Sequence, residues 1–285
     1  MRRMTLYLIA ARPYQWIKNL VVFAAPLAAG DIKKTEILDE TIVAAVLFLF
    51  ISISVYFFND VRDIEIDRRH PQKAQRPIAN GEIPYHHAIW FAFIIASASL
   101  TIGFWISSSL GVCLGSYVFI NILYSVKLKE IPYLELAFVS SGFVLRATAG
   151  GAASGVPVSF WFISLVSCTS LFVVVGKRYA ELSKYQTHVS RPVLRFYPLH
   201  ALRGSLVISL GLAVITYSFW LGLSENAWSV FSLASLIIFI LTMSRYSYQL
   251  HQGYGENPVK TLLGDYYLIA LSALWVLAYG MAIYG

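Results

Sequence analysis

Charged side chains are scarce in this sequence, and that scarcity is its most general feature. Asp, Glu, Lys and Arg together make up 13% of the 285 residues, about half of the ~25% that is usual in a soluble domain. Hydrophobic residues account for 58%, and the mean hydropathy is +0.64. The composition excludes an ordinary soluble domain and predicts an integral membrane protein.

Cysteine is scarce as well, and strand-like alternation is missing. Cys113 and Cys168 are the two cysteines, and because both fall within apolar runs we expect small core residues, not a disulfide or a metal pair. The apolar runs do not alternate as the strands of a membrane barrel do. Because a bilayer holds no water for unpaired backbone groups, the runs are predicted to be helices.

Nine apolar runs are long enough, or nearly long enough, to cross a bilayer. No change of composition marks a second domain. The sequence therefore predicts an all-α polytopic membrane protein, a single bundle of nine transmembrane helices forming one domain over residues 1–285, and it leaves a homo-oligomer possible. The runs cover residues 16–29, 41–58, 88–106, 110–126, 134–153, 160–176, 206–223, 228–243 and 266–284.

Lysine and arginine are unevenly distributed over the connecting segments. If the N-terminus is cytoplasmic, the long basic loops 59–87 and 177–204 lie on its side, and the cations opposite are only Lys33 and Lys34. The positive-inside rule supports this orientation, and it explains the net charge of +7, so no nucleic-acid partner is predicted. Because loops carry chemistry, we expect the active site on the cytoplasmic face.

The most informative segment directly follows the second apolar run. Asp60, Asp63 and Asp67 are spaced i, i+3, i+7, and Asn59 lies four residues before Asp63. On a helix these side chains would share one face. Acidic oxygens gathered at a membrane surface require a cation, and Mg²⁺ takes hard oxygen ligands together with substrate phosphates. We therefore expect all four residues to bind Mg²⁺.

Five cations interleave with this acidic segment or follow it: Arg62, Arg68, Arg69, Lys73 and Arg76. Cationic side chains form strong, charge-assisted hydrogen bonds with phosphate oxygens. Carboxylates for a metal beside cations for phosphate predict a diphosphate site at the mouth of a membrane protein.

The second long loop opens with Lys177, Arg178 and Glu181. On a continuing helix both cations can reach Glu181, at i, i+4 and i, i+3. The simple interpretation is an ion pair at a helix end, which contributes about 0.5 kcal/mol, and the alternative is a role in binding substrate. Lys129, at the end of the fourth run, would likewise either extend to the membrane interface or reach a phosphate.

Arg146 differs from the other cations because it falls inside an apolar run. It lies about 18 Å along the fifth run at 1.5 Å per residue. A charge at this depth is costly and usually faces a polar cavity or a partner. We expect Arg146 to line a cavity, where its partner would be a substrate phosphate or Glu135.

Several stretches together carry a resemblance to a known family. Nine spans with the pattern NDxxDxxxD after the second resemble the UbiA superfamily of intramembrane prenyltransferases, and the likeness covers essentially the whole chain. Within it, the sequence is similar to the branch that transfers phosphoribose to decaprenyl phosphate, for which the first and last stretches are specific. The stretches are RPYQWIKNLVVFAAPLAAG (12–30), NDVRDIEIDRRHP (59–71), RPIANG (76–81), VSSGFVLRATAGG (139–151) and GKRYAEL (176–182).

The resemblance implies a membrane-bound pentosyltransferase of the bacterial inner membrane. It implies Mg²⁺-dependent transfer of 5-phosphoribose from 5-phosphoribosyl 1-diphosphate to a polyprenyl phosphate, with release of diphosphate, for synthesis of cell-wall arabinan precursors. Asp60, Asp63 and Asp67 would be catalytic. The implied substrate-binding residues are Lys18, Asn59, Arg68, Lys73, Arg76, Tyr124, Lys129, Arg146, Lys177, Arg178 and Glu181.

Two other functions compete with this one. Prenyl-transferring members of the superfamily carry a second aspartate-rich motif after the sixth span, where this chain has Lys177, Arg178 and Glu181. A phosphoribosyl donor and a phosphate acceptor bring more phosphate than a prenyl diphosphate does, which favours cations there. The alternatives are a UbiA-type prenyltransferase that attaches a polyprenyl chain to an aromatic quinone or haem precursor, and a transporter or lipid-binding protein with a structural ion site.

Overall fold

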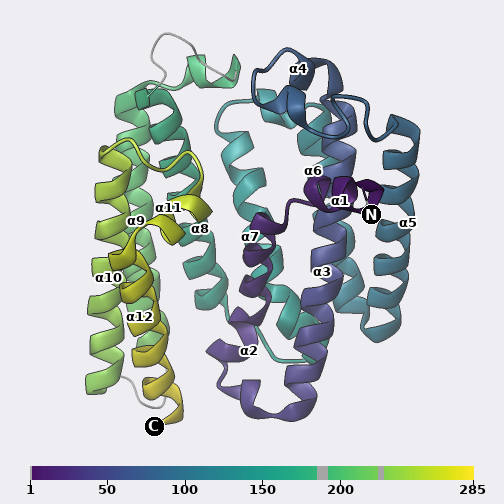
Figure 1. Cartoon of the computed structure of the whole chain (residues 1–285). Helices are drawn as coiled ribbons and strands as arrows, with labels where there is room; N and C mark the ends of the chain where they lie inside the picture. Colours follow the sequence, from purple (N-terminus) through teal and green to yellow (C-terminus); the bar gives the residue numbers. More distant parts are fainter. Residues whose placement is uncertain (1, 185–191, 224–227) are drawn as a thin grey trace. The chain divides into compact units, whose positions relative to one another are not determined.

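The computed structural model describes residues 2–184, 192–223 and 228–285, and all regular structure in these ranges is helical, as predicted (Figure 1). Eight helices are long and apolar enough to cross a membrane. Polar residues extend several of them beyond the apolar runs. The eight are α3 (Thr35–Arg62), α5 (Tyr85–Ile106), α6 (Ser108–Val126), α7 (Leu134–Ser154), α8 (Phe160–Lys184), α9 (Leu199–Gly222), α10 (Val230–His251) and α12 (Tyr266–Tyr284).

The first predicted span, 16–29, is not one continuous helix. It is divided into a 3₁₀ helix, η1 (Pro13–Phe23), and a short α-helix, α2 (Ala24–Ala28). Pro26 has no N–H, so it kinks or breaks the interior of an α-helix but is tolerated in the first turn, and the α-helix accordingly begins only two residues before it, at Ala24. Within the described residues, eight helices therefore have the length and composition of a spanning helix, and a broken helical segment takes the place of the first of the nine predicted spans.

The chain divides into two compact units, which are described separately. The first contains residues 1–128 and 145–157, and the second contains 129–144 and 158–285. The helix α7 contributes residues to both, so the predicted single domain stays a prediction. No contrast in composition marks this division, because both units are built from the same kind of apolar helix.

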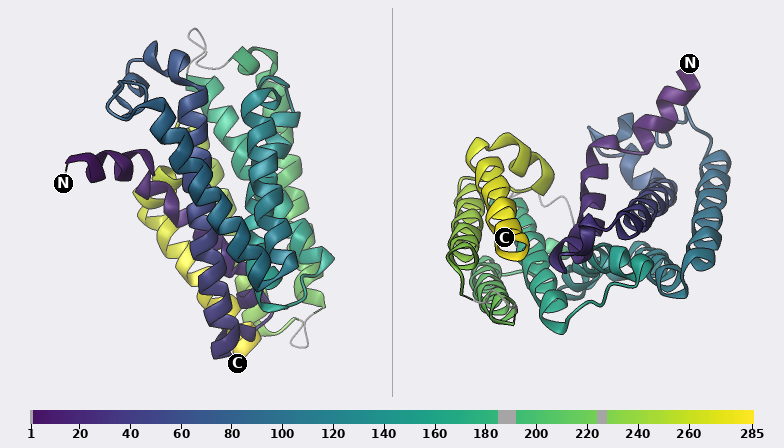
Figure 2. Two further views of the ribbon diagram at one scale, coloured as in Figure 1. Left: turned by 90° about the vertical axis from the view of Figure 1, so that its right-hand side faces the viewer. Right: turned by 90° about the horizontal axis from the view of Figure 1, so that it is seen from below.

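The first unit is centred on α3. This helix packs against α5, α6 and η1, and Figure 2 shows α3 beside α5 and α6. Buried aliphatic and aromatic side chains such as Phe48, Ile51 and Leu114 fill the space between these elements. A second apolar cluster, which includes Phe57, Ile78 and Ile83, anchors the segment that follows α3. The core therefore holds the polar end of α3 in a fixed position.

The second unit consists mainly of two helix pairs, α8 with α9 and α10 with α12. A buried core shared by the two pairs includes Phe172 of α8, Leu202 of α9 and Tyr246 of α10. The N-terminus of α12 is capped by Asp265, whose carboxylate accepts a hydrogen bond from the Leu268 N–H at 3.1 Å and an ion pair from Arg245 at 2.8 Å. These contacts fix α12 against α10.

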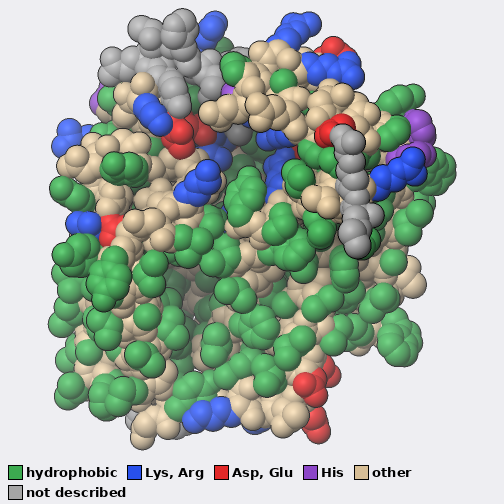
Figure 3. Space-filling model, viewed as in Figure 1, with side chains coloured by type: hydrophobic (Ala, Val, Ile, Leu, Met, Phe, Trp, Pro, Cys, Tyr) green, Lys and Arg blue, Asp and Glu red, His purple; other side chains and the backbone are tan. Residues whose placement is uncertain are grey.

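The outer surface has the character expected for lipid contact. On the face in Figure 3, hydrophobic side chains cover the broad middle and charged side chains gather mainly toward the upper and lower edges. Trp105 is 86% exposed and Val230 is 79% exposed. Apolar exposure on this scale is characteristic of a membrane protein. Both cysteines are free thiols, as predicted; Cys113 is buried and Cys168 is half-buried.

Gly150 allows α7 to approach η1 closely, and we expect Gly150→Ala to destabilise the protein. A Cβ atom at this position would lie 2.2 Å from the backbone oxygen of Val22. Relieving such an overlap costs roughly 1–3 kcal/mol. Gly280→Ala in α12 is the matched control, because nothing lies within 4 Å of its Cβ position. Thermal unfolding in detergent measures both, and equal midpoints for the two variants would contradict the close approach.

Candidate active site at the end of α3

The acidic segment is not the one continuous helix that the predicted shared face assumes, although the first and last of its three predicted aspartates still converge. The helix α3 ends at Arg62, Asp63 occupies its C-cap with φ −98° and ψ 10°, and a short helix, α4 (Ile64–Arg68), follows. This break redirects the chain between Asp60 and Asp67. Asp60 is 3% exposed and Asp67 is 2% exposed, whereas Asp63 is half-buried.

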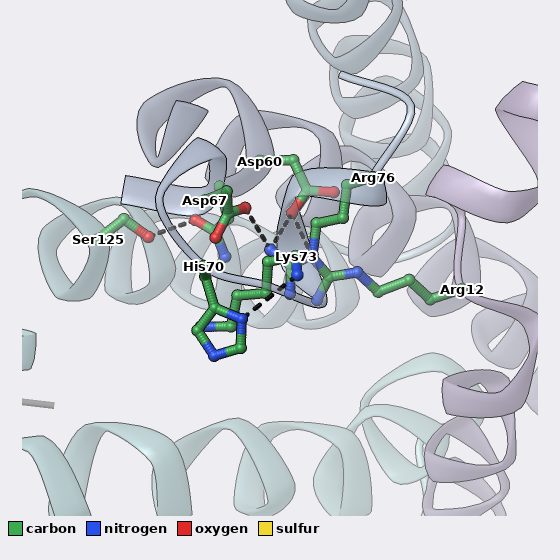
Figure 4. A network of polar contacts seen from close by, with 8 residues as sticks. Arg12, Asp60, Asp67, His70, Lys73, Arg76 and Ser125 are labelled. Atoms are coloured by element: carbon green, nitrogen blue, oxygen red, sulfur yellow. Dashed lines mark hydrogen bonds and ion pairs between the residues drawn. The ribbon is translucent and has the colours of Figure 1, made fainter. Parts of the chain in front are cut away.

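Asp60 and Asp67 converge on one guanidinium nitrogen. Arg76 Nη1 donates to Asp60 Oδ1 at 3.0 Å and to Asp67 Oδ2 at 2.6 Å. Arg12 Nη2 donates to the same oxygen of Asp60, and both arginine side chains point toward the two carboxylates in Figure 4. Two buried carboxylates are thus matched by two guanidinium groups, which is how proteins commonly satisfy buried charge.

Arg12 is a site residue that the sequence analysis missed. It has φ 54° and immediately precedes η1, and its guanidinium lies 5.1 Å from the centre of the Tyr56 ring. A positive φ is unusual for a residue with a side chain and marks a constrained position. The available signal was the Arg-Pro pair at the start of the first family-like stretch, but nothing in the sequence linked it to Asp60.

The segment after α4 is held by local polar contacts. Arg68 Nε donates to the Ala79 carbonyl at 2.9 Å, and the same side chain forms an exposed ion pair with Glu65 at 3.1 Å. His70 Nδ1 accepts the N–H of Lys73 at 3.3 Å, and Figure 4 places His70 and Lys73 beside the carboxylates. Arg68, predicted to bind substrate, therefore also braces the loop that carries Lys73 and Arg76.

The donor chemistry at this site fits a divalent metal ion. Mg²⁺ is usually held by one or two carboxylates together with substrate phosphates, and Asp60 and Asp67 supply two that converge. In the described part of the chain, no group of three or more His, Cys, Asp or Glu residues is arranged to hold a metal. The Asn59 side-chain oxygen accepts a hydrogen bond from Ser125 of α6. The observed contacts therefore bring together Asp60 and Asp67, and the metal-binding roles of Asn59 and Asp63 stay predictions.

The second predicted segment forms a buried ion-pair network in the other unit. Arg178 is 2% exposed and donates through Nε and Nη2 to the two oxygens of Glu135, both at 2.6 Å. Arg178 Nη1 also donates to Glu181 at 2.7 Å, and Lys177 Nζ lies 3.9 Å from the other Glu181 oxygen. The predicted helix continuation and both ion pairs are confirmed. Arg178 has two carboxylate partners in the interior, and its predicted role in binding substrate stays a prediction.

Tyr197 extends this network. Its hydroxyl accepts the N–H of Tyr133 at 2.7 Å and donates to Glu135 Oε1 at 3.5 Å. Burial, together with the nearby Glu135 carboxylate, raises the pKa of Tyr197 to about 12, so the phenol keeps its proton at neutral pH and can remain a donor. Tyr133 has a positive φ of 61°, which this hydrogen bond helps to hold.

The remaining predicted substrate-binding residues lie on different elements. Lys18 is half-buried on η1, Tyr124 is half-buried on α6, and Lys129 is half-buried in the 3₁₀ turn η4 (Leu128–Glu130). Part of the second predicted loop, residues 185–191, lies outside the described residues. The roles of these three side chains stay predictions.

Arg146 is 5% exposed and contacts neutral oxygens within the first unit. Its Nε donates to Asn19 at 3.0 Å, and its Nη2 donates to Ser52 at 3.1 Å and to the Tyr117 hydroxyl at 2.6 Å. Glu135, one of its two predicted partners, is instead paired with Arg178. One planar guanidinium thus joins η1, α3 and α6 to α7.

Arg146→Lys is expected to destabilise the protein even though it keeps the charge. A lysine has three N–H donors, but all three radiate from one nitrogen, whereas Arg146 reaches its acceptors from two nitrogens of a rigid fork, so a lysine cannot keep the same three contacts. Each buried acceptor left unsatisfied costs about 1–3 kcal/mol. Thermal unfolding in detergent tests this expectation, and an unchanged midpoint would leave substrate binding as the better account of Arg146.

The long apolar helices and the charged cluster at the end of α3 define a polytopic, all-helical membrane protein. The sequence model of the UbiA prenyltransferase family matches residues 20–271. The chain therefore belongs to the UbiA prenyltransferase family.

Individual relatives are similar over most of their length. The chain is 36% identical to decaprenyl-phosphate phosphoribosyltransferase of Mycolicibacterium smegmatis, over 96% of this chain and 91% of that protein. It is 35% identical to the protein of the same name from Corynebacterium glutamicum, over 96% and 86%. A solved structure of a UbiA homologue from Archaeoglobus fulgidus bound to DMAPP and Mg²⁺ has a TM-score of 0.75 and 19% identity, covering 97% of this chain and 98% of that one. At that identity the likeness shows the fold alone.

Proposed function

We propose that this protein transfers 5-phosphoribose from 5-phosphoribosyl 1-diphosphate to a polyprenyl phosphate in the membrane and releases diphosphate. The observation that carries the proposal is the convergence of the Asp60 and Asp67 carboxylates between Arg12 and Arg76. Relatives named decaprenyl-phosphate phosphoribosyltransferase, at 34–36% identity over nearly the whole chain, support the same reaction.

Asp60 and Asp67 would hold a Mg²⁺ ion against the donor diphosphate. The metal would supply a positive charge that stabilises the leaving group as negative charge develops on it. Arg12 and Arg76 are the guanidinium groups nearest to these carboxylates, and their planar forks match the paired oxygens of a phosphate. The chain's own contribution here is positioning and electrostatic stabilisation.

The transfer needs no strong general base. The bond between C1 of ribose and the diphosphate oxygen breaks, and its electron pair leaves with the diphosphate. A new bond forms between C1 and an oxygen of the acceptor phosphate, which is already ionised at neutral pH. Glycosyl centres pass through oxocarbenium-like states in such displacements, so binding both phosphates in line is the main demand on the protein.

The buried network changes how the second segment contributes to the proposal. Arg178 is balanced by Glu135 and Glu181, so the surplus of cations inferred from the sequence is smaller than the residue types suggest. Lys177, whose side chain is 32% exposed, remains the candidate phosphate contact in this segment. We place the reaction on the cytoplasmic side of a bacterial inner membrane, because the basic loops follow the positive-inside pattern.

A choice between two donors tests the proposal. Purified protein would be supplied, with and without Mg²⁺, with labelled 5-phosphoribosyl 1-diphosphate and polyprenyl phosphate, or with a labelled prenyl diphosphate and an aromatic acceptor. We expect Mg²⁺-dependent label in a lipid-soluble product from the first pair. Product from the second pair alone would establish an aromatic prenyltransferase, and product from neither would favour the non-enzymatic alternative.

A further inference from the structure

A single nitrogen of Arg76 makes the contacts with both carboxylates. Arg76 Nη1 lies within hydrogen-bond distance of both Asp60 and Asp67. This nitrogen occupies the place where Asp60 Oδ1 and Asp67 Oδ2 converge. An ion that bridges these two oxygens would have to lie in the same place. A guanidinium and a divalent cation repel each other, so they cannot share the position.

We propose that Arg76 competes with the metal for Asp60 and Asp67, and that the diphosphate relieves this competition by binding the displaced guanidinium. Metal and diphosphate then bind as a coupled pair, each strengthening the other by the same factor. The inference rests on the proposed function, because it concerns the same carboxylates and the same diphosphate, and it assigns Arg76 a positioning role that couples them.

The surroundings of Arg76 allow its side chain to move while its backbone stays in place. The carboxylates are buried, with side chains 4% and 2% exposed, whereas the Arg76 side chain is 28% exposed. The following residues, Ile78 and Ala79, are each 2% exposed and anchor the loop. A change of rotamer therefore takes the guanidinium off the carboxylates without rebuilding the fold.

Arg12 also contributes to this coupling, but its position is not equivalent to that of Arg76. It contacts Asp60, is 21% exposed at its side chain, and lies over the Tyr56 ring, which holds it to one side. Arg76 alone links both carboxylates among the described contacts. Its removal should therefore affect metal affinity more directly than removal of a neighbouring charge.

Mn²⁺ binding to the protein in detergent tests whether Arg76 competes with the metal. Binding is read from the loss of the EPR signal of free Mn²⁺. In Arg76→Met, we expect the Kd for Mn²⁺ alone to tighten by about tenfold relative to the unmodified protein. Arg69→Met is the matched control, because it removes the same charge from the same loop at an exposed position. Its Kd should stay within about twofold.

The preformed complex of Mn²⁺ with inorganic diphosphate supplies the second arm. The unmodified protein should bind this complex more tightly than Mn²⁺ alone, and Arg76→Met should lose that preference. If Arg76→Met binds Mn²⁺ no more tightly than the unmodified protein, the proposed competition between Arg76 and the metal is overturned. In that case the proposed function still stands, provided that the unmodified protein binds the complex of Mn²⁺ with diphosphate. If the unmodified protein fails to retain the complex, the proposed donor site fails with it. Arg76→Gln replaces Arg76→Met, with the same expected results, if the latter does not purify as a folded protein.

Discussion

Arg178→Met is expected to lower the stability of the protein sharply. The change leaves Glu135, which is 0% exposed, and Glu181, which is 9% exposed, without their shared guanidinium. Removing one member of a buried ion pair costs about 3–5 kcal/mol, because the remaining charge is uncompensated. At ~2–4 °C per kcal/mol for a chain of this size, the unfolding midpoint in detergent should fall by roughly 6–20 °C.

Two further variants separate this effect from a general loss of charge. Lys177→Met removes the adjacent cation, whose nitrogen is 3.9 Å from Glu181 and whose side chain is 32% exposed, and it should cost no more than about 1 kcal/mol. Glu135→Gln combined with Arg178→Met should recover part of the loss, because the uncompensated charge on Glu135 is gone. If Arg178→Met unfolds at the midpoint of the unmodified protein, the network is not structural and a substrate role for Arg178 regains support.

Asp67→Asn is expected to abolish most turnover while the protein still folds. The amide keeps the size of the side chain but loses the charge that would hold a metal ion. Substitutions that only support a metal ligand commonly cost 10–100-fold, so loss of a ligand should cost on the order of a hundredfold or more. The initial rate of lipid-product formation, measured across a range of Mg²⁺ concentrations, gives the effect.

Glu65→Gln is the matched control for this variant. Glu65 lies in the same short helix, and its side chain is 76% exposed and paired with Arg68 at 3.1 Å. The same change from carboxylate to amide should therefore leave the rate nearly unaffected. Equal rates for Asp67→Asn and the unmodified protein at limiting Mg²⁺ would remove Asp67 from the metal site.

The helices and the location of the acidic segment followed from the sequence, because both depend on local patterns. Apolar runs of bilayer length predict spanning helices wherever they occur, and the Asn59–Asp67 stretch stands out by composition. The break at Asp63 was not predictable from i, i+3, i+7 spacing, since that spacing assumes the helix continues. The spacing therefore identified Asp60 and Asp67 but not how they meet.

Contacts between distant residues were the part that the sequence did not reveal. Arg12 and Asp60 are 48 positions apart, and Glu135 and Arg178 are 43 apart. Glu135 is one of the two predicted partners of Arg146, yet tertiary packing pairs it with Arg178. Such choices depend on which helices pack together, and no local pattern carries that information.

A double-label transfer experiment tests the central claim most directly. The donor 5-phosphoribosyl 1-diphosphate would carry one phosphorus isotope in its 5-phosphate and another in its diphosphate, and it would be incubated with the protein, Mg²⁺ and a polyprenyl phosphate. We predict that the 5-phosphate label enters the lipid fraction while an equal amount of the diphosphate label appears as free diphosphate, separated from unreacted donor. Both changes should be lost in Asp67→Asn. Diphosphate label in the lipid, or no transfer of the 5-phosphate label with Mg²⁺ present, would contradict the central claim.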